Sequence, residues 1–115
     1  MAADESRQIA RRLLRLRQER SRHFAPVDAT GPAWDLMLVL FALPGEERDL
    51  CVGDLAEHAA VPRTTTVRRV RQLEQHGFVS VFDDSKDKRA VRVQLTPQGA
   101  SAVEATFATA AFKIR

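Results

Sequence analysis

The amino-acid sequence predicts an α+β fold that is mostly helical. Over most of its 115 residues, apolar side chains recur every three or four positions, which is the spacing of amphipathic helices. Residues 78–95 differ, because apolar and polar residues alternate there in two short runs separated by a charged tip. We therefore expect a series of helices, one β-hairpin and a final helix.

Length and composition exclude several classes of protein. A chain of 115 residues with 44% hydrophobic and 29% charged residues suits one small globular domain. It contains no apolar run of membrane-spanning length, and its first residues lack the basic-then-apolar order of a signal peptide. The single cysteine, Cys51, excludes an internal disulfide framework and suits a reducing compartment. We expect a cytoplasmic protein that does not bind membranes.

Charged residues are unevenly distributed along the chain. Residues 1–24 contain seven arginines and three acidic residues, whereas residues 25–62 contain one arginine and seven acidic residues. Residues 63–76 are basic again, with four arginines and one glutamate. Localised basic segments in a chain whose net charge is only +3 indicate a surface that faces a polyanion.

The N-terminal segment is predicted to be a helix that ends near His23, since Pro26 disfavours helix at the residue before it. Ile9, Leu13 and Leu16 form an apolar stripe, and most of the arginines point away from this stripe. We expect the helix to dock through its apolar stripe. The alternative is an arm that binds nucleic acid.

The next elements lead towards a pair of helices. Pro32 opens a helix whose residues 33–43 are apolar on nearly all sides, so this helix should be buried in the centre. Residues 50–52 suit a short strand that leads into a short helix over residues 53–60. Cys51 lies near the N-terminal cap of that helix, where Ser or Thr is more usual.

Residues 61–77 predict a helix with two different faces. Its inward face is formed by Thr66, Val67, Val70 and Leu73 at helical spacing. Its outward face carries Thr64, Thr65, Arg68, Gln72 and Gln75, with Arg69 and Arg71 on the two flanks. Hydroxyls, amides and arginines are the side chains that read base edges and phosphates in the major groove of DNA. Taken alone, the segment suits an ordinary solvated helix equally well.

The elements on either side of this helix favour a nucleic-acid interpretation. The short helix before it and the tight turn between them form a helix-turn-helix. Gly77 ends the second helix, and strands over residues 78–82 and 90–95 enclose a charged tip at residues 83–89. Thr96-Pro97 then opens a last helix. Its predicted apolar stripe is Ala100, Val103, Phe107, Ala110, Ala111 and Ile114. This order of elements is that of a winged helix.

Over roughly residues 50–99 the sequence also resembles the MarR family of bacterial winged-helix regulators. The matching segments are Asp54-Leu55-Ala56, Thr65-Thr66, Leu73-x-x-x-Gly77-Phe78-Val79, Asp87-Lys88-Arg89 and Leu95-Thr96-Pro97-Gln98-Gly99. The resemblance implies a homodimer that reads a pseudo-palindromic DNA operator, with residues 63–76 in the major groove. It also implies that Arg89 is the wing arginine at the minor groove, and that Asp87 helps to hold the wing.

Three features depart from the family pattern. Val81 stands where many members have a basic residue at the base of the wing, which puts one phosphate contact in doubt. Arg69 stands where relatives often place an apolar or aromatic residue, so it could contact phosphate or a neighbouring helix. About nineteen residues follow Thr96, too few for two long C-terminal helices. Dimerisation should therefore rely on the first and last helices.

The sequence gives little support for catalysis or metal binding, and we do not expect the protein to be an enzyme. His23, His58 and His76 are scattered, and no nucleophile–histidine set or phosphate-binding glycine loop is present. Asp54 and His58 are four residues apart, but two ligands alone do not define a metal site. We expect no metal and no cofactor.

Two further hypotheses concern the apolar residues. Cys51 near a helix N-terminus could be a reactive thiol, but we expect a redox-inert, small apolar side chain. A small-molecule effector site lined by Trp34, Met37 and Phe41 is the alternative to ordinary core packing, which we expect. The sequence suggests no ligand for such a site.

The predicted function is a sequence-specific regulator of transcription that binds double-stranded DNA. The domain spans residues 1–115, with the winged helix-turn-helix at 32–95 and a dimerisation region formed by the helices at 1–24 and 97–115. The residues expected to contact DNA are Arg63, Thr64, Thr65, Arg68, Arg69, Arg71, Gln72, Lys86, Lys88 and Arg89. The alternative is a winged helix that serves protein interaction or a replication assembly without reading an operator.

Overall fold

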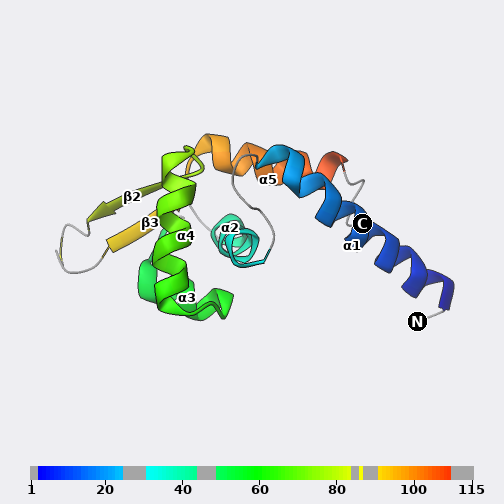
Figure 1. Cartoon of the computed structure of the whole chain (residues 1–115), viewed down its shortest axis with the longest axis horizontal. Helices are drawn as coiled ribbons and strands as arrows, with labels where there is room; N and C mark the ends of the chain where they lie inside the picture. The colour runs from blue at the N-terminus through cyan, green and yellow to red at the C-terminus, as the bar shows by residue number, and fades with distance from the viewer. Residues whose placement is uncertain (1–2, 25–30, 44–48, 84–85, 87–90, 110–115) are drawn as a thin grey trace.

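The structure is a computed structural model that describes residues 3–24, 31–43, 49–83, 86 and 91–109 (Figure 1). The helices are α1 (Ala3–His23), α2 (Pro32–Ala42), α3 (Val52–Ala59), α4 (Arg63–Gln75) and α5 (Pro97–Thr109). The strands are β1 (Asp49–Cys51), β2 (Val79–Asp83) and β3 (Val91–Leu95). The predicted α+β class and the order of elements are confirmed.

Helix α2 lies at the centre of the body, as its apolar sequence predicts. Figure 1 shows it end-on, with α4 beside it and α5 above it. Its side chains Trp34, Leu36, Met37 and Leu40 are at most 4% exposed. The buried side chains contributed by other elements include Leu55, Leu73, Val93 and Val103. The core is therefore shared by the helix-turn-helix, the sheet and α5.

The three strands form an antiparallel sheet in the order β1-β3-β2. The hairpin pairs β2 with β3 from Val79 opposite Leu95 to Asp83 opposite Val91. On the other side of β3, β1 places Leu50 opposite the fully buried Val93. The short strand before α3 was predicted, although it begins one residue earlier than expected. Its pairing with β3 was not predicted.

Helix α1 is attached to the body mainly at its C-terminal end. None of its 21 residues is buried, and Ile9 and Leu13 are 39% and 51% exposed. Phe24, the residue after the helix, is only 1% exposed. Figure 1 shows α1 running along α5 and then away from the body towards the N-terminus. Within one chain, the predicted apolar stripe of α1 is therefore only partly covered by other elements.

The predicted apolar stripe of α5 is incomplete. Val103 is buried as expected, but Phe107 is half-buried, and the buried positions also include Gly99, Ala102 and Thr106. Thr106 can be buried because its hydroxyl donates to the carbonyl oxygen of Ala102 at 2.7 Å. The stripe is rotated towards these small residues. Ala110, Ala111 and Ile114 lie outside the described residues.

Candidate nucleic-acid interface

A tight turn positions α4 directly after α3. Ala60 has a left-handed conformation, with φ of 54°, at the end of α3. The amide of Val61 donates to the carbonyl of Ala56 at 3.0 Å, so the last turn of α3 is closed. Val61 is buried, and Pro62 occupies the N-terminal cap position of α4. The chain therefore turns from α3 into α4 within three residues and forms the predicted helix-turn-helix.

The inward face of α4 holds the helix against the body. Thr66, Val70 and Leu73 are buried, and Val67 is half-buried. The hydroxyl of Thr66 donates to the carbonyl oxygen of Pro62 at 3.0 Å, which satisfies the polar group in a buried position. The inward side predicted from helical spacing is confirmed.

The outward face of α4 presents polar and basic side chains to solvent. Arg63, Thr64, Arg68 and Arg71 are exposed. Thr65 and Gln72 were expected on the same face but are half-buried. The four exposed residues form a surface with three positive charges and a short hydroxyl, on a helix that can be approached from outside.

Arg69 differs from the other arginines of α4. Its guanidinium Nη1 donates to the amide oxygen of Gln72 at 3.0 Å, and the side chain is half-buried. Its Nε is buried and has no hydrogen-bond partner among the described residues. Bidentate reading of adenine requires both the amide oxygen and the amide NH₂ of a glutamine. The bond from Arg69 therefore occupies one of the two lone pairs of the Gln72 amide oxygen and restricts the orientation in which Gln72 can read adenine.

Helix α4 ends in a Schellman motif at Gly77. Gly77 has φ of 81°, a left-handed conformation that glycine adopts without strain. Its amide donates to Glu74 at 3.0 Å, and the amide of Phe78 donates to Leu73 at 2.9 Å. Leu73 and Phe78 are both buried, as the hydrophobic contact of this motif requires. These bonds explain the spacing Leu73-x-x-x-Gly77-Phe78.

The first turn of α5 meets the end of α4. The hydroxyl of Thr96 donates to the carbonyl of Gly77 at 2.6 Å and accepts the amide of Gly99 at 3.0 Å. The side-chain amide of Gln98 donates to the carbonyl of His76 at 3.2 Å. The predicted cap at Thr96 is confirmed. The same hydroxyl also binds another element, which was not expected.

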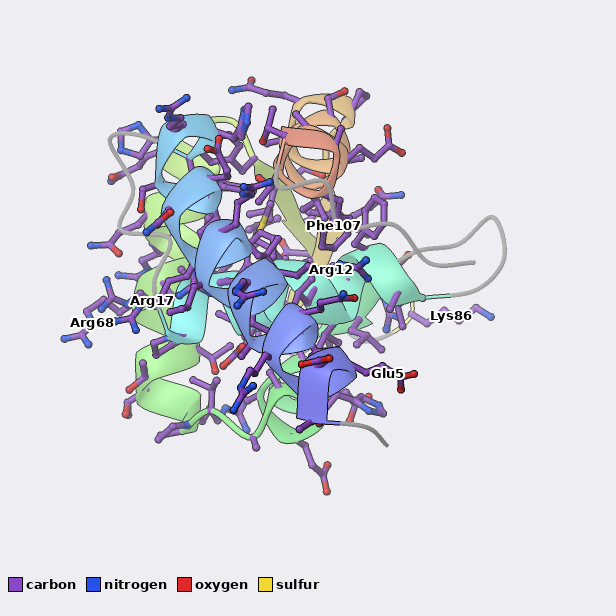
Figure 2. All side chains as sticks on the ribbon, turned by 90° about the vertical axis from the view of Figure 1, so that its right-hand side faces the viewer. Glu5, Arg12, Arg17, Arg68, Lys86 and Phe107 are labelled. Carbon is purple, nitrogen blue, oxygen red and sulfur yellow. The ribbon has the colours of Figure 1, made fainter. Side chains whose placement is uncertain are left out.

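The wing is the hairpin of β2 and β3, and these two strands project beside α4 (Figure 1). Lys86 is exposed, whereas Asp87, Lys88 and Arg89 lie outside the described residues. Figure 2 shows Arg68 and Lys86 at opposite edges of the molecule, so these two side chains do not form one continuous patch. The structure thus brings the outward residues of α4 together but does not bring Lys86 next to them.

The base of the wing is held by an ion pair that the sequence interpretation missed. The guanidinium of Arg92 on β3 binds the carboxylate of Asp49 on β1, and it also donates to the backbone carbonyl of Asp49 at 3.4 Å. Both side chains are partly buried, 31% and 17% exposed. No local pattern marks this pair, because its partners are 43 residues apart and meet only through the sheet.

A groove of about 670 Å³ lies between the start of α3, α4 and the wing. Val81, which stands where many family members have a basic residue, forms part of its wall. The lining residues are Cys51, Val52, Gly53, Arg63, Val67, Val70, Arg71, Glu74, Val81 and Val91. Cys51 is half-buried in this wall. Its redox inertness stays a prediction.

The residues of the alternative effector site contribute to the core. Trp34 and Met37 are buried in the core, and Phe41 is half-buried. The ring of Phe107 packs edge-on against Trp34 at 6.0 Å and against Phe41 at 6.1 Å between centroids. These aromatic contacts are core packing, as expected. Among the described residues, no group of three potential metal ligands comes together.

The chain is similar to one known protein family and to several solved structures. A model of the MarR family matches residues 38–91. The S. aureus MepR–DNA complex superposes with a TM-score of 0.71 at 20% identity, covering 93% of this chain and 82% of MepR. A MarR mutant from E. coli complexed with operator DNA gives 0.64 at 20% identity, with coverage of 93% and 74%. YusO from Bacillus subtilis gives 0.69 at 19% identity, with coverage of 96% and 79%.

The fold, the helix-turn-helix and the hairpin define the class of winged helix-turn-helix proteins. Within this class, the three superpositions show that the chain shares its fold with MarR-type winged-helix proteins, and the MarR family model matches its residues 38–91. The element order predicted from the sequence and the resemblance to this family are both confirmed. No described helix is long and apolar enough to cross a membrane.

Proposed function

We propose that this protein is a transcriptional regulator that binds double-stranded DNA in a sequence-specific manner. The observation that carries this proposal is the outward face of α4, on which Arg63, Thr64, Arg68 and Arg71 are exposed while the opposite face is anchored in the core. Structures of MepR and E. coli MarR, which share the fold, contain bound DNA. The protein acts by binding and not by catalysis, and it does so in the cytoplasm.

The residues of the interface divide into two roles. Arg68, Thr64, Thr65 and Gln72 face the floor of the major groove, where arginine pairs with guanine and glutamine with adenine. The phosphates on both sides are contacted by Arg63, Arg69 and Arg71. In the wing, Lys86 and Lys88 contact phosphates, Arg89 approaches the minor groove, and Asp87 holds the wing in place. An arginine suits a narrow minor groove because the negative potential is enhanced there.

A homodimer is the form in which α4 would read a pseudo-palindromic operator. Ile9 and Leu13, which are four residues apart on one side of α1, are 39% and 51% exposed, and Leu14 on the adjoining side is 58% exposed. A second copy that covers these side chains removes apolar surface from water. In this proposal residues 32–95 read DNA, and α1 and α5 join the protomers. Two-fold symmetry of the protein is then mirrored in the operator.

The replacement Arg68→Ala should lower affinity for the selected operator and relax its base preference. The loss of one bidentate contact to guanine costs about 1–3 kcal/mol at the contacted position. The measurement is selection of duplexes from a random pool, followed by binding titrations with the wild type and the variant. Arg12→Ala on α1 is the matched control, because it removes one exposed arginine away from α4. Unchanged affinity and base preference in Arg68→Ala would mean that α4 is not the reading helix.

The same selection distinguishes the alternative function. A protein-interaction module would enrich no duplex from the random pool, and its residual DNA binding would depend weakly on salt. A regulator with several phosphate contacts should lose affinity steeply, with a slope in log affinity against log salt of about −0.9 per neutralised phosphate. Lys86→Ala should weaken all duplexes alike and reduce the magnitude of that slope by about one.

A further inference from the structure

One hydroxyl group joins the proposed reading helix to the helix that follows the wing. At the C-terminus of α4, the Schellman motif uses the amides of Gly77 and Phe78 but leaves the carbonyls of His76 and Gly77 without helical partners. The side chains of Thr96 and Gln98, from the first turn of α5, supply the missing donors at 2.6 and 3.2 Å. The end of one helix is thus capped by the start of another.

Thr96 is the central residue of this junction. Its hydroxyl donates to Gly77 and accepts from Gly99, so both hydrogen-bonding capacities of the group are directed by the fold. Its backbone amide donates to the carbonyl of Phe78 at 3.1 Å. Two of these bonds tie Thr96 to the exit of α4, and the third fixes Thr96 to the first turn of α5, so a change in the angle between the helices would stretch the first two together.

Helix α5 and the residues after α4 are packed too closely to shift along each other. Gly99 is buried, and a methyl group at this position would overlap the carbonyl oxygen of Phe78. The backbones of α5 and of the α4 exit are therefore in direct contact. The wing is held at the same place, because Val79 pairs with Leu95 in the residues next to Phe78 and Thr96.

Helix α5 transmits this orientation to α1. His23 hydrogen-bonds Thr109 at 3.1 Å, and Phe107 packs on Trp34, over which the guanidinium of Arg20 lies at 5.6 Å. The helices assigned to dimerisation are thus connected to α4 through the Thr96 junction. In the proposed dimer, the angle at this junction would contribute to the separation and rotation of the two reading helices.

We propose that Thr96 is a positioning residue whose hydroxyl fixes the orientation of α4 relative to α5 and thereby selects the spacing between operator half-sites. The part that concerns spacing rests on the proposed DNA-binding function, whereas the part that concerns orientation does not. A change of one base pair in spacing rotates one half-site by about 35° around the duplex axis. A rigid junction therefore discriminates strongly between neighbouring spacings.

The first test measures the orientation without DNA. Spin labels are attached through Gln75→Cys on α4 and Glu104→Cys on α5 in a Cys51→Ser background, and labelled protein is diluted with unlabelled protein so that dimers carry one labelled protomer. Pulsed dipolar spectroscopy then gives the distribution of label distances. We expect a narrow distribution for the wild-type junction and a broad or shifted one for Thr96→Val. Thr96→Ser, which keeps the hydroxyl, should restore the narrow distribution.

The second test uses operators with half-site spacings that differ by one base pair. Wild type and Thr96→Ser should prefer one spacing by roughly tenfold or more, since twisting the duplex to fit another spacing costs free energy. Thr96→Val should reduce this preference to about threefold or less while each half-site keeps its base preference. A general loss of stability would lower affinity for all spacings equally and would not change their ratio.

The outcomes separate the two proposals. If Thr96→Val keeps the narrow, unshifted distance distribution, the positioning role of Thr96 is wrong, whatever happens on DNA. If the distribution broadens but the wild type selects no duplex, the DNA-binding function is wrong and the positioning of α4 by α5 remains supported. Should Thr96→Val fail to fold, Gln98→Met removes the bond to His76 from an exposed position and should broaden the distribution to a smaller extent.

Discussion

Gly99→Ala should destabilise the protein by about 3 kcal/mol, because the added methyl group has no space. It would overlap the carbonyl oxygen of Phe78 and approach its carbonyl carbon to 3.0 Å and Leu95 Cδ2 to 3.1 Å. The first of these is a backbone atom that already accepts the amide of Thr96, so it cannot move without loss of that bond. Urea unfolding of the wild type and the variant measures the difference in free energy.

Gly53→Ala provides the matched control for this prediction. Gly53 lies in the first turn of α3, and a methyl group there would meet only the guanidinium Nη1 of Arg63 at 3.8 Å, an ordinary contact. Alanine in a helix is more favourable than glycine, so this variant should gain about 0.5–1 kcal/mol. Equal stability of the two alanine variants would show that the close approach of α5 to Phe78 is wrong.

Phe24→Ala should cost about 3–5 kcal/mol, since it removes a buried aromatic side chain and leaves a cavity. Phe24 is 1% exposed, and its ring packs edge-on against Trp34 at 5.8 Å and tilted against Phe78 at 4.9 Å. It is the place where the chain leaving α1 enters the core. We therefore expect a large fall in the melting temperature, measured by calorimetry or circular dichroism.

Phe82→Ala makes the same chemical change at a different place. Phe82 lies on β2 in the wing and is 40% exposed, so much of its surface is already in water. Its truncation should cost less than about 1 kcal/mol. If Phe24→Ala were as mild as Phe82→Ala, α1 would not be anchored to the core through Phe24.

The reading helix could be predicted from sequence because its pattern is local. Thr66, Val70 and Leu73 share one side of a helix by spacing alone, and the structure buries all three. The end of the helix was equally predictable, since Gly77 supplies a left-handed conformation that other residues adopt only with strain. The roles of the outward residues towards DNA are chemical expectations, and they stay predictions until binding is measured.

Helix α5 shows where hydropathy alone fails. Periodicity placed Val103 correctly, but apolar character favoured Phe107 over Thr106 for the buried stripe. The structure buries Thr106 because its hydroxyl is satisfied by the carbonyl of Ala102 within the helix. It also buries Gly99, whose contribution is close backbone contact and not side-chain area. A hydropathy scale captures neither effect, because it ranks side chains only by their free energy of transfer from water.

Contacts between distant segments could not be predicted from the sequence for a different reason. The pair between Asp49 and Arg92 needs the sheet order β1-β3-β2, which no local pattern encodes. Likewise, the bond between Arg69 and Gln72 depends on the rotamers that the surrounding packing selects. Helical spacing placed both side chains near the outward face, but it did not indicate that they would bind each other.

The pairing of β1 with β3 has a thermodynamic consequence for the wing. Because Asp49 and Arg92 lie 43 residues apart and meet at the sheet, the helix-turn-helix and the hairpin form a long loop with its ends joined. The entropy cost of closing a loop grows only with the logarithm of its length, and doubling the length adds about 0.6 kcal/mol. Residues added at the hairpin tip lengthen a shorter loop, the one closed by the pair Asp83–Val91, and doubling that loop also adds only about 0.6 kcal/mol, so the reach of the wing can change while α4 stays in place.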